Sequence, residues 1–242
     1  MNIKDSVVLI TGANRGLGLA LAKALIKAGA RKVYGGARKT HSGARKPGNP
    51  NEAGVIPIQL DVTSAADIAT AVRELGDVTI LINNAGVDLG SAVMAPAAMT
   101  TLRSELETNL FGPMALSQAF APVLGSNGGG AIVNVLSALS WVNMAKHGTY
   151  SITKSAAWSL TNGLRGELAS QNTQVVGVHV GYMETDMTES ITDPKVNPAD
   201  VASAILTAVE NNEDEVLADG TAQYLKAELS ATRGIYLGPP RG

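Results

Sequence analysis

The chain has 242 residues, of which 45% are hydrophobic and 17% are charged, with 26 glycines and a formal net charge of -2. This length and composition suit one α/β domain with a sizeable core better than a disordered or fibrous chain. The chain has no cysteine and only three scattered histidines, so we expect no disulfide, no cysteine nucleophile and no bound metal. We find no signal-peptide core and no apolar run long enough to span a membrane, and we therefore expect a cytoplasmic protein without a membrane partner.

Basic residues gather near the start of the chain. Ten of the 19 lysines and arginines precede Glu52, and no acidic residue lies between Asp5 and Glu52. A segment of this kind is expected to face an anion. Nucleic acid is one candidate, but the segment lacks the aromatic residues or recognition helix that such a partner usually requires, so we expect none.

The first predicted strand, Ser6–Ile10, runs into the glycine loop Thr11–Gly18, and a predicted helix over Leu17–Ala28 follows. In this order the glycines let backbone N–H groups approach a pyrophosphate, and the helix N-terminus adds partial positive charge. The spacing, G-x-x-x-G-x-G, is a variant of the commoner dinucleotide loop. We predict a bound dinucleotide here, the alternative being a glycine-rich turn without a ligand.

A second predicted strand, Lys32–Gly36, leads into the basic pair Arg38 and Lys39. A loop that prefers NAD offers an acidic residue to the ribose hydroxyls at this point. The basic strand end instead favours the 2′-phosphate of NADP(H), with Arg38 as its expected ligand. The next residues, Thr40–Gly54, predict a flexible surface loop, whose basic residues have a second interpretation as plain solvated charges.

Strands and helices alternate through the rest of the chain. The further predicted strands are Val55–Leu60, Val78–Ile82, Ala131–Leu136, Gln174–Val180 and Asp214–Leu217. The predicted helices are Ala65–Leu75, Thr101 to about Leu124 with a kink at Pro113, Tyr150–Ala169 and Pro198–Glu210. The alternation predicts an α/β fold: a Rossmann-like doubly wound parallel sheet of about seven strands, with helices on both faces, in a single domain over residues 1–242.

Three side chains between residues 137 and 154 could form a proton-transfer site. Tyr150 and Lys154 are four residues apart and would share one helix face. A cation about 4 Å from the phenol, at an effective dielectric near 20, is worth roughly 4 kcal/mol and would lower the phenol pKa by about three units at most. Tyr150 could then exchange a proton with a carbonyl oxygen, and Ser137, at the end of a predicted strand, would be a second donor. A Tyr-x-x-x-Lys pair also arises by chance, so its meaning depends on the rest of the chain.

Taken together, these features resemble the short-chain dehydrogenase/reductase family over essentially the whole chain. The resemblance rests on TGANRGLG at residues 11–18, Asp61, NNAG at 83–86, Asn109, Ser137 and YSITK at 150–154. The interval of thirteen residues from Ser137 to Tyr150 matches the family's usual one and lacks the insertion of its monomeric carbonyl reductases. The resemblance therefore implies a homo-oligomer, with a tetramer favoured over a dimer.

The resemblance implies catalytic roles for four residues. Tyr150 is the expected acid/base, Ser137 positions the carbonyl, Lys154 lowers the phenol pKa and binds the nicotinamide ribose, and Asn109 holds a water that links Lys154 to solvent. It also implies cofactor contacts along the glycine loop, at the following strand ends and after the sixth strand: Gly12, Asn14, Arg15, Gly16, Leu17, Gly18, Arg38, Asp61, Val62, Asn83, Ala85, Gly86, Met183 and Thr185, together with Tyr150 and Lys154.

The substrate side is less defined. Where the family usually has Pro-Gly after the sixth strand, this chain has Val180 and Gly181. Without the proline a backbone N–H is free and the turn that borders the expected nicotinamide pocket is less constrained. We expect a substrate loop near residues 182–200 and a short C-terminal segment over 220–242. The expected pocket residues, each of which could instead be an ordinary core or interface residue, are Leu139, Trp141, Met144, Tyr182 and Met187, with Met183 beside them.

The function expected from the resemblance is that of an NADP-dependent carbonyl reductase, or alcohol dehydrogenase, that interconverts a small-molecule carbonyl and its alcohol. One rival is a non-catalytic NADP(H)-sensing protein on the same fold, but the tyrosine and lysine are both present. A second rival is an isomerase, epimerase or dehydratase, and such relatives are typically longer at the C-terminus.

Overall fold

Seven parallel strands form one sheet, in the order β3-β2-β1-β4-β5-β6-β7, in a computed structural model that describes residues 1–38 and 54–238. The strands are β1 (Val7–Thr11), β2 (Lys32–Ala37), β3 (Ile56–Gln59), β4 (Ile80–Asn83), β5 (Gly130–Val135), β6 (Thr173–His179) and β7 (Glu215–Leu217). All seven predicted strands are confirmed, with ends that shift by one or two residues. Lys39 and most of the predicted loop Thr40–Gly54 lie outside the described residues.

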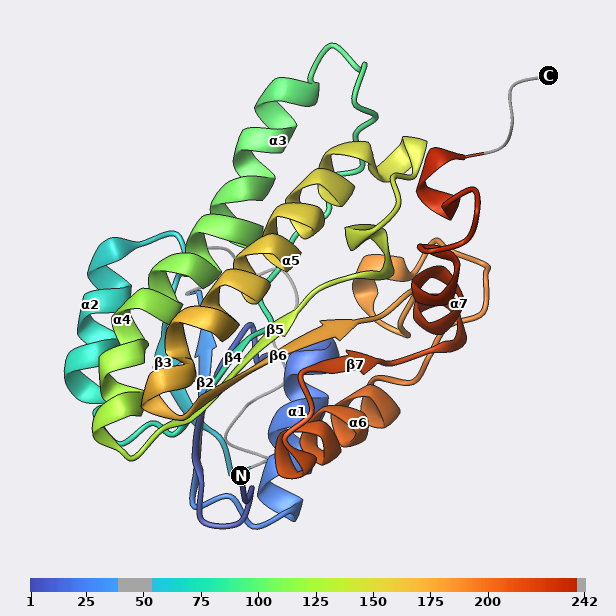
Figure 1. Ribbon diagram of the computed structural model, residues 1–242. Helices are drawn as coiled ribbons and strands as arrows, with labels where there is room; N and C mark the ends of the chain where they lie inside the picture. The colour runs from blue at the N-terminus through green and yellow to red at the C-terminus, as the bar shows by residue number, and fades with distance from the viewer. Residues whose placement is uncertain (39–53, 239–242) are drawn as a thin grey trace.

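Helices cover both faces of the sheet, as predicted (Figure 1). The helices α1 (Gly16–Lys27) and α6 (Pro198–Asn211) pack side by side on one face. On the other face lie α2 (Ala65–Glu74), α4 (Gly112–Ser126) and α5 (Gly148–Leu168). Apolar stripes on these helices meet the strands, which read as near-continuous hydrophobic runs because both faces are covered.

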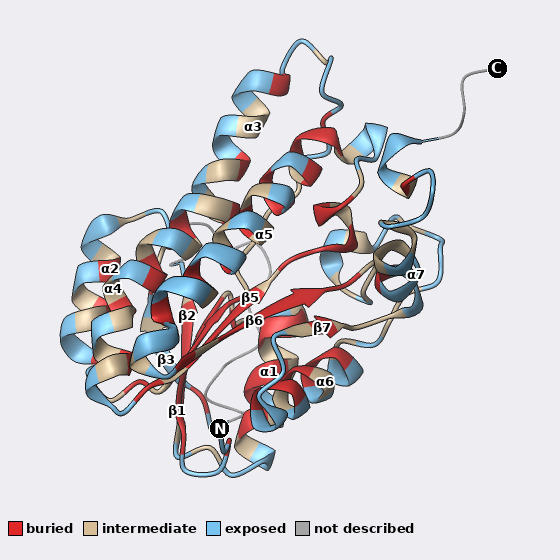
Figure 2. Cartoon of the chain, viewed as in Figure 1, coloured by how far each residue is buried: buried red, intermediate tan, exposed pale blue. Residues whose placement is uncertain are grey.

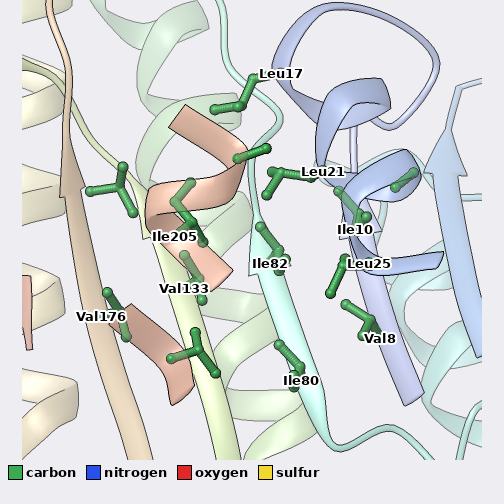
Figure 3. Close-up of a cluster of buried hydrophobic side chains, with 14 of the residues drawn as sticks. Val8, Ile10, Leu17, Leu21, Leu25, Ile80, Ile82, Val133, Val176 and Ile205 are labelled. Atoms are coloured by element: carbon green, nitrogen blue, oxygen red, sulfur yellow. The ribbon is translucent and has the colours of Figure 1, made fainter. Parts of the chain in front are cut away.

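The two faces of the sheet carry separate cores. Beneath α1 and α6 the core includes Ile10, Leu21, Ile82 and Ile205, all buried (Figure 3). On the opposite face Phe120 is among the largest fully buried side chains. Figure 2 shows the central strands buried along most of their length, with exposed residues on the outward faces of the helices, whereas the edge strand β3 is largely exposed. The rigid element of the fold is therefore the sheet, to whose edge the site is attached.

The long helix predicted from Thr101 to about Leu124 is divided differently in the structure. It comprises α3 (Ala98–Leu106), a π-helical turn at Glu107–Phe111 and α4. Pro113 lies at the start of α4, directly after the π turn and within the same continuous helical run, and a kink at this residue stays a prediction. The π turn is the irregular part of this helical run, and such turns frequently occur at functional sites. It carries Asn109.

The C-terminal part adds a helix that the sequence did not predict, α7 (Gly220–Glu228), which follows β7. Asp219 caps its N-terminus by accepting from the N–H of Ala222 at 2.8 Å. Ala222 is buried against Ala138 and Trp141, in the segment that follows β5. Over the described residues, no helix has the length and apolarity needed to cross a membrane.

Candidate active site

The carboxyl ends of β1, β4, β5 and β6 meet at one edge of the sheet, and the segments after them form the candidate site (Figure 1). The strand order turns back between β1 and β4, since β2 and β3 lie to one side of β1 and the later strands to the other. Open parallel sheets bind ligands at such a point.

The glycine loop after β1 has the backbone that a closely bound phosphate requires. Gly12 and Gly16 have φ angles of +67° and +52°, which glycine adopts without strain. An added Cβ at Gly18 would overlap the carbonyl oxygen of Gly12, so α1 can start directly behind the loop only if no side chain stands there. The loop thus presents backbone N–H groups and a helix N-terminus, and these fit the pyrophosphate of a dinucleotide.

The turn at Asn83–Gly86 is joined to the glycine loop through Thr11. Asn84 Nδ2 donates to the Thr11 carbonyl oxygen at 2.8 Å, and the N–H groups of Asn84 and Ala85 each donate to Thr11 Oγ1 at 3.0 Å. The two loops therefore form one continuous wall. Asn84 was not among the predicted site residues, because the motif does not reveal which of its two asparagines faces the other loop.

Two expected cofactor contacts have side chains that point into the protein. Asn83 is buried and its Nδ2 donates to Asn134 Oδ1 at 2.8 Å. Leu17 is buried in the core between α1 and the sheet (Figure 3). Any contact of these residues with a cofactor is thereby restricted to their backbone atoms.

A cavity of about 250 Å³ opens at the end of β2. It is lined by Ala13, Asn14, Gly35, Ala37, Arg38, Pro57, Ile58 and Gln59. One exposed arginine beside apolar walls fits the adenosine end of a dinucleotide. The expected adenine contacts Asp61 and Val62 do not line it: Val62 is buried, and Asp61 Oδ1 accepts from Thr63 Oγ1 at 2.8 Å.

The segment after β6 lies against the glycine loop. Arg15 Nη1 is 3.1 Å from Asp186 Oδ2, and a Cβ added to Gly16 would lie 3.2 Å from the Thr185 methyl carbon. Thr185 is therefore close to the expected pyrophosphate position. The Arg15 pair is exposed and contributes little to stability. Met183 forms a β-bridge with Val196, and its side chain packs against the core rather than standing free.

The structure brings Ser137, Tyr150 and Lys154 together, as predicted from their spacing. Ser137 follows β5, and the other two lie in the first turns of α5. The Lys154 ammonium is buried, donates to the Val135 carbonyl oxygen at 2.8 Å and lies 5.6 Å from the centroid of the Tyr150 ring. The Ser137 side chain lies near enough to the Tyr150 phenol to lower its pKa. A carbonyl oxygen placed here would meet two hydroxyl donors beside one cation.

Burial controls the protonation of this group. It raises the pKa of Tyr150, Asp88 adds to the rise, and the Ser137 hydrogen bond opposes it. Burial also lowers the pKa of Lys154 to about 8. The sequence had predicted a phenol with a lowered pKa, and the structure gives the opposite sign. The physical reason is that burial disfavours the charged phenolate strongly. The Lys154 ammonium, which points at the Val135 carbonyl oxygen, stabilises the phenolate by less than this desolvation cost.

Asn109 joins three segments around the lysine. Its Oδ1 accepts from the Val87 N–H at 2.9 Å, while its Nδ2 donates to the Val87 carbonyl oxygen at 2.8 Å and to Thr153 Oγ1 at 3.0 Å. A small void of about 10 Å³ lined in part by Asn83, Asn109 and Lys154 lies behind the site. That volume is near the minimum for one water.

A histidine–aspartate pair beside the tyrosine was not predicted from the sequence. His147 Nδ1 is 2.6 Å from Asp88 Oδ2, and both side chains are largely buried. His147 lies three residues before Tyr150, so the two share a side of the helix start. Glu105 is fully buried and accepts from the Leu89 N–H at 2.8 Å. The three-residue spacing was the one available signal, but nothing in the sequence linked it to Asp88.

The expected substrate residues fall into two groups. Trp141 is buried, 6.4 Å from Trp158 between ring centroids, so it packs in the small core beneath the site. Met144 and Met187 are exposed. Leu139 and Tyr182 are half-buried, and burial raises the Tyr182 pKa. Contact of these residues with a substrate stays a prediction.

The turn at Val180 and Gly181 is held by a partner that replaces the rigidity of the usual proline. The Gly181 N–H donates to Asp219 Oδ2 at 2.8 Å, and the same carboxylate caps α7. Val180 itself is buried in the core. Asp219, the N-cap of α7, therefore holds the turn after β6 in place.

Comparison with known proteins agrees with this geometry. A family model described as short chain dehydrogenase matches residues 6–196. A ketoacyl reductase, HetN, from Nostoc is 30% identical over 89% of this chain and 79% of its own length, and a 3-oxoacyl-acyl-carrier-protein reductase, FabG, from Vibrio cholerae is 29% identical over 98% and 100%. A solved short chain dehydrogenase from Burkholderia cenocepacia, in complex with NADP, is 38% identical, covers 96% of both chains and superposes with a TM-score of 0.87. The chain belongs to the short-chain dehydrogenase/reductase family of oxidoreductases.

Proposed function

We propose that this protein is an NADPH-dependent oxidoreductase that reduces a ketone or aldehyde to an alcohol. The observation that carries the proposal is the convergence of Ser137, Tyr150 and Lys154 at the sheet edge, beside loops that fit a dinucleotide. When bound, the nicotinamide supplies the hydride. The protein's part is to orient the carbonyl and to provide the proton.

The protonation state of the site suits proton donation to a carbonyl oxygen. A phenol whose pKa is raised stays protonated at neutral pH, so Tyr150 can donate its proton to the carbonyl oxygen as negative charge develops there. Ser137 stabilises the same oxygen by a hydrogen bond. Below pH about 8 Lys154 carries its charge and can bind ribose hydroxyls of the cofactor.

Arg38 supports NADPH over NADH. It is exposed at the end of β2 and lines the cavity that fits the adenosine end. A 2′-phosphate placed there would receive charge-assisted hydrogen bonds, and the described strand end offers no carboxylate to the ribose hydroxyls. The solved Burkholderia cenocepacia relative was crystallised with NADP.

The geometry supports a carbonyl compound as the substrate and does not select one class of carbonyl compound. The relatives named ketoacyl reductase and 3-oxoacyl-acyl-carrier-protein reductase make 3-oxoacyl compounds the first candidates to assay. Simple ketones, keto esters and aldehydes complete the panel.

We also propose a homo-oligomer, with a tetramer as the expected size. The exposed apolar side chains of Phe111, Met114 and Ile152 lie on the π turn, α4 and α5. Large apolar residues exposed on helix faces favour a closed symmetric assembly.

Replacing Tyr150 by Phe should abolish carbonyl reduction while NADPH still binds. The ring and its packing remain and only the transferable proton is lost. Initial rates and cofactor fluorescence measure the two effects, with Tyr224→Phe on the exposed face of α7 as the matched control. Turnover within roughly tenfold of the parent, a difference of about 1.4 kcal/mol, would contradict the assigned role.

The pH profile of kcat/KM should fall as the pH rises through about 8. Burial lowers the Lys154 pKa, so its charged form is lost at a lower pH than for an exposed lysine, whereas Tyr150 stays protonated. The free-enzyme pKa values appear in this profile. A rate that stays constant up to about pH 10 would show that the Lys154 charge is not needed.

Arg38→Asp should raise the KM for NADPH by about tenfold or more and leave the KM for NADH equal or lower. One charge-assisted hydrogen bond is worth roughly 1.5–3 kcal/mol. Arg31→Asp, at the opposite end of β2, makes the same charge change away from the cavity and serves as control. If the parent already uses NADH as efficiently as NADPH, the cofactor assignment is wrong.

Light scattering at micromolar concentration should report a tetramer. Ile152→Lys places a charge on the exposed apolar surface of α5 and should shift the mass towards smaller species. A monomeric parent would refute the assembly.

A further inference from the structure

His179, at the end of β6, is fully buried directly beneath the active site. Its Nδ1 lies 3.1 Å from the carbonyl oxygen of Ser137. A carbonyl oxygen can only accept, so Nδ1 must carry the hydrogen and donate it. Burial lowers the pKa of His179, which keeps the ring neutral and the second nitrogen, Nε2, without a proton.

The peptide group between Ser137 and Ala138 is fixed from several sides. The Ser137 carbonyl oxygen accepts from the Ser140 N–H at 3.0 Å as well as from His179, and the Ala138 N–H donates to the Val180 carbonyl oxygen at 2.9 Å. The orientation of this peptide determines where the Ser137 Cα–Cβ bond points. His179 provides the one side-chain donor among these contacts.

The imidazole is itself held in place. It stacks on Trp141, with ring centroids 3.9 Å apart and planes at 18°. On its far side Nε2 is 3.5 Å from Glu215 Oε1, and Glu215 pairs with Lys226 at 2.8 Å. The stack on Trp141 therefore leaves the ring little freedom to turn away from Ser137.

This arrangement is a poor choice for stability alone. In the neutral ring Nε2 is an acceptor facing a carboxylate oxygen, and it has no hydrogen-bond partner within the described part of the chain. Leaving a buried polar atom unsatisfied costs about 1–3 kcal/mol. An apolar side chain could fill the same space, but it could not donate a hydrogen bond to the Ser137 carbonyl oxygen as Nδ1 does.

We propose that His179 is a positioning residue for Ser137: its Nδ1–H holds the Ser137 peptide so that the serine hydroxyl is directed at the substrate carbonyl oxygen. The proposal rests on the proposed carbonyl reduction, in which Ser137 contacts that oxygen. His179 touches neither substrate nor cofactor and acts through the serine backbone. Small errors in such positions are costly for rate.

The matched pair His179→Asn and His179→Leu isolates the donor. Asparagine and leucine have nearly the same shape and leave the same space beside Trp141, but only asparagine can donate to the Ser137 carbonyl oxygen. We expect kcat within about threefold of the parent for Asn and lower by about tenfold or more for Leu, with the KM for NADPH unchanged in both. Equal rates for the two variants would overturn the proposal, because a packing role is lost equally in both.

The same pair in a Ser137→Ala background separates positioning from general damage. If His179 acts through the serine hydroxyl, Asn and Leu give equal residual rates once that hydroxyl is gone. A further loss for Leu in this background would also contradict the proposal.

Crystal structures of the two variants give a readout that needs no turnover. The Ser137–Ala138 peptide should keep its orientation with Asn and rotate with Leu, and an unchanged peptide in both would overturn the proposal. A parent protein that reduces no carbonyl compound would contradict the proposed function. An active parent whose Asn and Leu variants have equal rates would contradict this inference alone.

Discussion

The parallel alignment of the strands is the constraint on which the site depends. Because β1, β4, β5 and β6 point the same way, residues far apart in sequence, such as Thr11, Val135 and His179, end at one edge. Backbone carbonyl oxygens at that edge then accept hydrogen bonds from side chains of the site. The Val135 carbonyl oxygen accepts from Lys154, and the Ser137 carbonyl oxygen accepts from His179. The register of the sheet thus fixes the active-site geometry before any cofactor contact is made.

Desolvation is the dominant electrostatic effect at this edge. It moves the pKa of Tyr150 up and that of Lys154 down, each towards its neutral form. Before the reaction the Tyr150 phenol is consequently protonated and can donate its proton. Acidic groups close by, Asp88 first, reinforce this state for Tyr150 and oppose it for Lys154. The site is therefore organised around proton donation to an oxygen, in agreement with carbonyl reduction.

Sequence patterns predicted local features well and three-dimensional partners poorly. The strands, the glycine loop and the four-residue step from Tyr150 to Lys154 are determined by short-range chemistry, and the structure confirms them. The π turn at Asn109 was missed because the sequence pattern indicates one long helix there, and only the structure shows the wider turn that precedes Pro113. The sign of the Tyr150 pKa shift was wrong because burial cannot be seen in a spacing. Asp88 with His147, and His179 with Ser137, bring together residues 59 and 42 positions apart, which no motif connects.

The most direct test of carbonyl reduction follows the hydride itself. With NADPH that carries deuterium at both C4 positions and a 3-oxoacyl or ketone substrate, one deuterium should appear on the carbinol carbon of the product alcohol, delivered to one face. In deuterated solvent with ordinary NADPH, that carbon should stay unlabelled, because the proton from Tyr150 goes to oxygen. Solvent label at the carbinol carbon, or an alcohol product without cofactor-derived deuterium, would contradict the account.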